Sequence, residues 1–245
     1  MHISLSAEPL FFIGNFPITN SMVVAWCAMA FLVGISAFLT RRLDVIPRGG
    51  QNVIELIVEK LLAFVTDATG SSVRAKKLFP LAATIFLFVL AVNWMGLLPG
   101  AGTVGIFAVE HGERVLTPFW RASSADLNFT LALSLISVIA IQIFGIQAIG
   151  VKHYIGKFIT FKDPIAFFVG ILEIISEIGK IISLSFRLFG NIFAGEVLLT
   201  VMLTLVPYVV PVPFLAMEVF VGFVQAFVFS MLTLVFASMA MEEAH

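Results

Sequence analysis

Five long stretches without a single Asp, Glu, Lys or Arg constrain this chain more than any other feature of its 245 residues. They cover residues 9–40, 78–109, 127–151, 197–217 and 219–241, and the shortest is 21 residues long. A helix needs about 20 apolar residues to cross the roughly 30 Å of hydrocarbon in a bilayer. Five such stretches are not typical of a soluble core, and we therefore expect an integral membrane protein.

The rest of the composition excludes several functions. The net charge is −1, so the chain has no basic surface for nucleic acid. The four histidines all lie outside the expected spans, which leaves no intramembrane histidine to bind haem or a metal. Residues 150–157 (GVKHYIGK) resemble a phosphate-binding loop, but the spacing is one residue too long and no Ser or Thr follows the Lys. We therefore expect a simple loop there, with no nucleotide, cofactor or metal bound by this chain.

Apolar runs and turn residues predict an all-α membrane protein that forms a single membrane domain over residues 1–245. Five crossing helices are expected at about residues 22–39, 79–98, 128–150, 164–206 and 214–241. Residues 47–69 instead mix apolar and polar side chains in an amphipathic rhythm, which is typical of a helix lying at the membrane surface. A polar loop is expected between the second and third spans.

The fourth expected helix is too long for a perpendicular crossing. More than forty residues at about 1.5 Å each would extend about 60 Å, which is twice the hydrocarbon thickness. This helix must therefore be steeply tilted, bent, or partly outside the hydrocarbon. Pro207, Pro211 and Pro213 mark a turn after it, so we expect the last two helices to fold back as a hairpin.

Positive charge in the expected loops lies mostly on one side. Ten Lys and Arg residues fall between the first two spans or after the third, and only Arg114 and Arg121 fall between the second and third. The ten are Arg41, Arg42, Arg48, Lys60, Arg74, Lys76, Lys77, Lys152, Lys157 and Lys162. Cytoplasmic loops carry such an excess. If every span crosses, the N-terminus is outside and the C-terminus is in the cytoplasm.

Six ionisable side chains interrupt the last two apolar helices. Each costs several kcal/mol in hydrocarbon unless it faces protein or water, so all six are functional candidates. They are Glu173, Glu177, Lys180, Arg187 and Glu196 in the fourth span and Glu218 in the fifth. Glu173, Lys180 and Arg187 are seven residues apart and share one helix face. Glu177 lies three residues before Lys180 and can pair with it, which for these two residues leaves a purely structural reading open.

Arg187 has no such neighbour. Glu196 is nine residues away, which is about 13 Å of rise and about 180° of rotation, so the two cannot bond within the helix. Arginine keeps its charge at any accessible pH. We therefore expect another helix or another subunit to supply the anion.

The hairpin geometry predicts two cross-helix neighbours. Counting outward from the turn at Pro207 puts Glu218 across from Glu196 and Gln225 across from Arg187, to within a few residues. Two carboxylates close together in a low dielectric repel each other and can therefore hold and release a proton. A permanent positive charge at a different depth suits a proton path that must not run straight through the membrane.

These residues also carry a resemblance to a known family. Residues 183–196 (SLSFRLFGNIFAGE) resemble the signature of subunit a of F-type ATP synthases. Residues 225–229 (QAFVF) and 238–243 (SMAMEE) are similar to the last helix of that family. Residues 93–99 (NWMGLLP) and 126–128 (DLN) are similar to two of its span boundaries. The resemblance covers the chain from about residue 45 to its end.

The resemblance implies a role for each matching position. Arg187 corresponds to the arginine that faces the carboxylate of the rotating c-ring. Asn191 and Gln225 correspond to polar neighbours along the ion path. Glu196 and Glu218 occupy the two positions lining the half-channel open to the outside, where members vary between acid, His and small residues. Glu173 corresponds to a carboxylate toward the cytoplasmic half-channel, with Ser183 nearby.

The implied machine is the stationary proton channel of a rotary motor in a bacterial cytoplasmic (inner) membrane. Its implied partners are the c-ring at the Arg187 face, the b subunits of the peripheral stalk, and membrane lipid; the chain itself is not an enzyme. Two alternatives stay open on the residues alone. A secondary ion transporter would show internal repeats, of which we find none. A scaffold or quinone-site subunit of a redox complex would use the same charges as structural pairs.

Overall fold

The structure is a computed structural model that describes residues 7–41, 49–98, 104–110, 113–158, 164–206 and 209–242. In these ranges the chain forms seven α-helices, one short 3-10 helix and two β-hairpins. The helices are α1 (Asn20–Leu39), α2 (Gly50–Thr69), α3 (Ser72–Met95), α4 (Leu127–Ile149), α5 (Val151–Phe158), α6 (Pro164–Leu205) and α7 (Pro211–Ala240), with η1 at Ser123–Ala125. The hairpins pair β1 (Pro9–Ile13) with β2 (Phe16–Thr19) and β3 (Gly105–Glu110) with β4 (Glu113–Pro118).

The prediction of an all-α integral membrane protein is confirmed. Four helices, α1, α3, α4 and α7, are long and apolar enough to cross a membrane. The fifth crossing, by α6, stays a prediction, and so does the single domain. The bounds agree closely with those expected, except that α3 begins at Ser72 rather than near residue 79. Its first turns carry Arg74, Lys76 and Lys77, so this helix continues beyond the apolar stretch.

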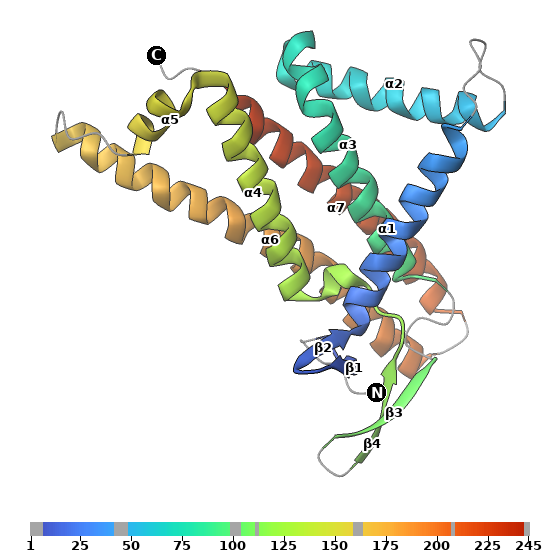
Figure 1. Ribbon diagram of the computed structural model, residues 1–245. Helices are drawn as coiled ribbons and strands as arrows, with labels where there is room; N and C mark the ends of the chain where they lie inside the picture. The colour runs from blue at the N-terminus through green and yellow to red at the C-terminus, as the bar shows by residue number, and fades with distance from the viewer. Residues whose placement is uncertain are drawn as a thin grey trace.

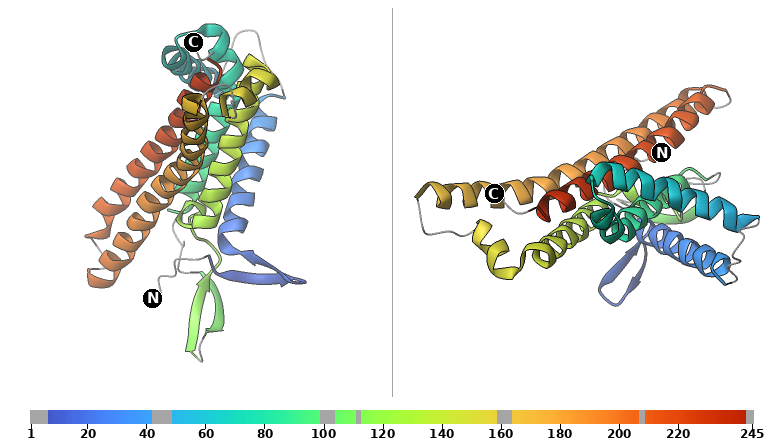
Figure 2. Two further views of the ribbon diagram at one scale, coloured as in Figure 1. Left: turned by 90° about the vertical axis from the view of Figure 1, so that its left-hand side faces the viewer. Right: turned by 90° about the horizontal axis from the view of Figure 1, so that it is seen from above.

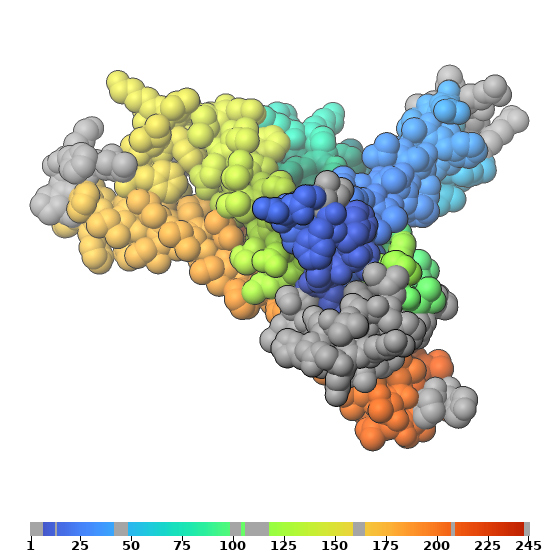
Figure 3. Space-filling view, turned by 60° about the horizontal axis from the view of Figure 1, so that its bottom comes forward, coloured from blue at the N-terminus to red at the C-terminus, as the bar shows by residue number. Residues whose placement is uncertain are grey.

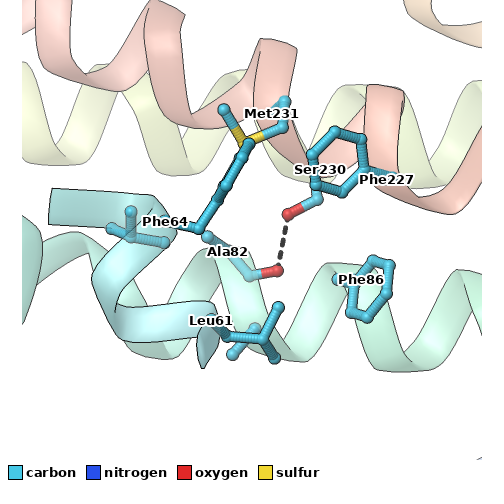
Figure 4. Close-up of a pocket in the computed structure, with 9 residues that line it drawn as sticks. Leu61, Phe64, Ala82, Phe86, Phe227, Ser230 and Met231 are labelled. Atoms are coloured by element: carbon cyan, nitrogen blue, oxygen red, sulfur yellow. Dashed lines mark hydrogen bonds between the residues drawn. The ribbon is translucent and has the colours of Figure 1, made fainter. Parts of the chain in front are cut away.

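The expected surface helix appears as α2, which runs across the ends of α1 and α3 in Figure 1. It begins at Gly50 and ends before Gly70, whose φ of 62° is favoured by glycine. Residues 47 and 48 of the expected helix lie outside the described residues. The apolar face of α2 packs on α3 and α7 around a small pocket, beside which the Ser230 Oγ donates to the Ala82 carbonyl at 2.7 Å (Figure 4).

Four elements were not expected from the sequence. Residues 99–126, expected to be a plain loop, contain the β3–β4 hairpin and η1, and residues 9–19 form the β1–β2 hairpin. The loop expected at residues 150–157 is wrong, because Val151–Phe158 forms the helix α5. A tertiary contact holds α5: a Cβ on Gly145 of α4 would lie 2.5 Å from the Tyr154 ring, so only glycine allows this approach.

The two ends of the bundle differ in character. Both hairpins and η1 lie at one end, whereas α2, α5 and the start of α3 lie at the other (Figure 1). The described cations from the ten-residue set belong to elements at that second end, apart from Arg41, which follows α1 directly. The ten-to-two division of charge therefore corresponds to a physical division of the molecule.

The long helix α6 contributes only one stripe to the core. Leu184, Leu188 and Ile192, each at most 3 % exposed, pack with Val89 of α3 and Ala226 of α7. The C-terminal half of α6 runs beside α7, and both helices lie obliquely to α4 (Figures 1 and 2). This oblique course agrees with a steep tilt, which was one of the three expected ways for so long a helix to fit a bilayer. The opposite face of α6, which includes Ile182, Phe186 and Arg187, is exposed in the described part of the chain.

A polar network joins α4, α5 and α6 at the α5 end. The Gln142 Nε2 donates to Glu177 at 2.8 Å, and the Tyr154 hydroxyl donates to the Gln142 Oε1. The Lys180 Nζ lies 2.6 Å from the Glu177 Oε1, so the expected Glu177–Lys180 pair is present. Burial raises the pKa of the Tyr154 phenol to about 12, and the nearby charges of Glu177 and Glu173 add to that shift.

We predict that Tyr154 titrates near pH 12 in the folded chain rather than near the usual value of about 10. Because the folded-state pKa is raised, the neutral phenol stabilises the fold below pH ~10, and that contribution is lost as pH rises through about 12. The measurement is the tyrosinate absorbance of the purified chain as a Tyr208→Phe variant, which leaves Tyr154 as its one tyrosine. Titration near pH 10 would contradict the network, and Tyr154→Phe is the blank.

Candidate functional site

Arg187 lies on the uncovered face of α6. Its neighbours Leu184 and Leu188 point into the core, and Arg187 and Asn191 are both exposed. The Asn191 Nδ2 donates to the carbonyl of Arg187 at 3.0 Å, so this amide is fixed one turn from the arginine. In the part of the chain that the structure describes, Arg187 forms no ion pair. A permanent cation is therefore displayed on an exposed face that also carries Phe186 and Ile182.

A second charged group lies further along α6. The Arg121 Nε donates to the two carboxylate oxygens of Glu196 at 3.1 and 3.4 Å. The Arg121 side chain is 6 % exposed and that of Glu196 is 31 % exposed. Burial from solvent strengthens the attraction between two such charges. This pair was missed from the sequence, where Arg121 counted only as a loop cation, because its partner is 75 residues away.

Local packing brings Arg121 to this position. The Trp120 Nε1 donates to the Met95 carbonyl at 2.6 Å, and Ala122 lies directly on Gly96 at the end of α3. A side chain at residue 96 would collide with Ala122, so the glycine permits the close approach. The tight segment that follows, including Ser123 and Ser124, is buried throughout.

Glu218 of α7 completes the group. It is 5 % exposed, and its Oε1 lies 2.9 Å from the position that a Cβ on Gly195 would occupy. The other carboxylate oxygen, Oε2, is buried and has no hydrogen-bond partner among the described residues. Burying a carboxylate without a partner costs several kcal/mol, and a bound proton removes the charge. The predicted approach of Glu218 to Glu196 is thus confirmed to within one residue, because Gly195 directly precedes Glu196.

The remaining candidates are spread along the helix pair. Glu173 forms an ion pair with Lys157 of α5 at 2.6 Å, close to the polar network. It lies 23 residues before Glu196, or about 35 Å along the helix. Ser183 is exposed and Gln225 is half-buried. The approach of Gln225 to Arg187 stays a prediction.

Along α6, the site therefore consists of three separate zones. Glu196 and Glu218 lie with Arg121 toward the C-terminal end of α6. Arg187 lies in the middle of the helix, and Glu173 lies with Lys157 at the α5 end. Among the described residues, no group of three His, Cys, Asp or Glu side chains is placed to hold a metal ion. The arrangement is suited to moving protons between fixed charges rather than to covalent chemistry.

We predict that cysteines at positions 195 and 218 form a disulfide readily. The cysteine at residue 218 removes the carboxylate that would obstruct a side chain at residue 195, and the two positions are in contact. The measurement is the oxidant-dependent shift of a proteolytic fragment, in a Cys27→Ala background. A pair at residues 187 and 218 is the control, since it should not cross-link. Efficient bridging of that control pair instead would disprove this register.

Comparison with known proteins gives a consistent result. Residues 22–238 match the model of the family described as ATP synthase A chain. The chain is 33 % identical to ATP synthase subunit a of Moorella thermoacetica over 227 residues, which cover 93 % of both chains. It is 39 % identical to ATP synthase subunit a of Nitratiruptor sp. over 202 residues, which cover 82 % of this chain and 80 % of that one.

A third relative covers the chain completely. ATP synthase subunit a 2 of Syntrophotalea carbinolica is 32 % identical over 248 residues, which cover 100 % of this chain and 94 % of the relative. The family match, the four apolar helices and the charged zones on α6 and α7 agree with one another. This multi-pass membrane protein of bacterial type belongs to the ATP synthase A chain family, the a subunits of ATP synthases.

Proposed function

We propose that this chain is the stationary proton-channel subunit of an F-type ATP synthase. It would form two half-channels that open to opposite sides of the membrane and meet the rotating c-ring at the Arg187 face. The observation that carries this proposal is the exposed Arg187, which forms no ion pair among the described residues of its own chain. A fixed cation on an uncovered apolar face calls for an anion on a partner.

The order of the three zones along α6 supports a direction for the path. A proton would enter from outside past Glu196 and Glu218 and neutralise a carboxylate of the c-ring, which could then turn into the lipid. After nearly a full rotation the site would return to Arg187, whose guanidinium favours the ionised carboxylate. The released proton would leave to the cytoplasm past Ser183 and Glu173, with Asn191 and Gln225 lining the meeting point.

Arg187 would also separate the two half-channels. About 13 Å of helix rise separates it from Glu196, and about 21 Å separates it from Glu173. A proton carried on water or carboxylates meets a permanent positive charge between these zones and is repelled. Each proton moved through 100 mV supplies about 2.3 kcal/mol, so several must act together to make one ATP.

The chain would act as one component and bind no nucleotide, with nucleotide chemistry left to other subunits. Lipid and the b subunits of the peripheral stalk are its other proposed neighbours. The alternatives of a secondary transporter and a redox scaffold lose their support with membership of this family. The proposed orientation has the N-terminus and the hairpins outside, and the α2 and α5 end in the cytoplasm.

We predict that cysteines placed at Val104 and Val73 react with a membrane-impermeant thiol reagent from opposite faces. Both positions are well exposed, at 62 % and 78 %, and they lie at opposite ends of the bundle. Residue 104 should react from outside and residue 73 from the cytoplasm, because the Lys and Arg excess is at the second end. Cys27→Ala alone is the unlabelled control. Reaction of both cysteines from the same face would contradict the topology.

We predict that Arg187→Ala reduces ATP-driven proton pumping in membrane vesicles to the level of vesicles without the complex. The protein should stay in the membrane, because the Arg187 side chain is exposed and contributes no core contact. Arg187→Lys should fail as well, since an ammonium can lose its proton in a low-dielectric site and lacks the breadth of the guanidinium. Passive proton leakage should rise in the alanine variant.

The matched control is Lys76→Ala, which removes an exposed cation at the far end of the molecule. It should pump at the normal rate. Normal pumping by Arg187→Ala, at equal content of the assembled complex, would refute the proposed function.

A further inference from the structure

Glu177 and Lys180 form an ion pair within α6 that the proposed proton path does not use. The Lys180 Nζ lies 2.6 Å from the Glu177 Oε1. The Lys180 side chain is 19 % exposed and that of Glu177 is 15 % exposed, so both charges are largely shielded from solvent. The Lys180 Nζ also lies 5.2 Å from the centre of the Phe236 ring, a cation–π contact that holds the lysine from the side of α7.

The second carboxylate oxygen of Glu177 is also held. The Gln142 Nε2 of α4 donates to the Glu177 Oε2 at 2.8 Å, and the Gln142 Oε1 accepts a hydrogen bond from the Tyr154 hydroxyl of α5. Tyr154 is 4 % exposed, and its ring lies against Gly145 of α4. A chain of bonds through three helices therefore fixes the carboxylate that pairs with Lys180.

The helix α5 is itself fixed between α4 and the first half of α6. Figure 3 shows the α4–α5 segment alongside the first half of α6. A Cβ on Gly170 of α6 would collide with the carbonyl oxygen of Phe158, the last residue of α5. The Lys157–Glu173 ion pair, at 2.6 Å, joins the same two helices. These close contacts hold Tyr154 in one position relative to α6.

Lys180 lies midway between Arg187 and Glu173 on one face of α6. It is seven residues from each, which is about 10 Å of helix rise in either direction. The proposed exit path runs from Arg187 to Glu173 and therefore passes Lys180. An unpaired charge about 10 Å away, at an effective dielectric constant of about 20, changes the local proton population about tenfold. Without its anion, Lys180 would be a second positive barrier in the exit path.

We propose that Gln142 and Tyr154 are positioning residues that hold Glu177 on Lys180, so that the charge of Lys180 is neutralised and does not block the cytoplasmic half-channel. The proposal rests on the channel function proposed above. Glu177 carries no proton in this role, because both of its carboxylate oxygens are engaged in bonds. Arg187 then remains the one cation of α6 without an ion pair among the described residues.

The test is ATP synthesis by vesicles that carry the assembled synthase, under a fixed proton gradient and normalised to the amount of assembled complex. Glu177→Gln keeps the side-chain shape but leaves Lys180 without its anion, so we expect the rate to fall about tenfold. Lys180→Gln leaves an acid, which does not repel protons, so the rate should stay within about twofold of normal. The Glu177→Gln/Lys180→Gln double variant should also return to within about twofold of normal, because neither charge remains.

The same reasoning tests the two positioning residues. Gln142→Leu removes the donor to Glu177, and we expect a loss of about threefold, because Lys180 still holds the other oxygen. Tyr154→Phe acts one bond further away and should have the smaller effect. Adding Lys180→Gln to Gln142→Leu should restore the rate, because the position of Glu177 no longer matters once the cation is gone. A purely structural role of Gln142 predicts no such restoration.

The matched control is Glu242→Gln. It removes the acid of another ion pair, formed with Arg74 at 2.5 Å outside α6, and should leave the rate unchanged. If Glu177→Gln does not assemble, the comparison of Gln142→Leu with and without Lys180→Gln decides the question.

Three results would overturn the proposal: a normal rate in Glu177→Gln, equal losses in Glu177→Gln and Lys180→Gln, or no restoration of Gln142→Leu by Lys180→Gln. Each of them would leave the channel function intact. Normal pumping by Arg187→Ala would instead refute the channel function itself.

Discussion

The cost of an ionisable side chain in hydrocarbon governs the whole structure. Such a group must face protein or water, and each unsatisfied charge costs several kcal/mol. α6 carries five of them and gives only the Leu184–Leu188–Ile192 stripe to the core. The chain satisfies the rest with partners from distant segments, Arg121 for Glu196 and Lys157 for Glu173. Of these five, Arg187 alone forms no ion pair among the described residues, and under the proposed function its anion is supplied by the c-ring.

Features that depend on local pattern were predictable from the sequence. Apolar stretches predicted the bounds of the long helices to within a few residues, because charge is mostly absent from a span, except for the start of α3, whose first turns are charged. The register of α6 against α7 was also predictable, since the prolines between the two helices marked a turn in the sequence and residue spacing gave the facing positions. Glu218 accordingly lies on Gly195, one residue from the expected Glu196.

Features that depend on long-range contacts were not predictable. Arg121 and Glu196 meet across 75 residues, and nothing near either residue shows the pairing. The eight residues of α5 were expected to form a loop. Their contacts are with distant residues of α4, because Tyr154 packs on Gly145 and bonds to Gln142. The two hairpins are short, and two-stranded sheets of this size hold only against other elements. The sequence therefore revealed the acids of the site but not the arginine that organises them.

The two arginines near the acids of the site, Arg121 and Arg187, lie in opposite environments. Arg121 is buried and bonded to Glu196, so its positive charge is largely neutralised by that carboxylate. Arg187 is exposed and forms no ion pair among the described residues. Under the proposed function, an arginine beside Glu196 and Glu218 whose charge was not neutralised would repel incoming protons. Under the proposed function, a chain that admits protons at one depth and blocks them at another needs one neutralised arginine, which is Arg121 beside Glu196, and one arginine without an ion pair among the described residues, which is Arg187.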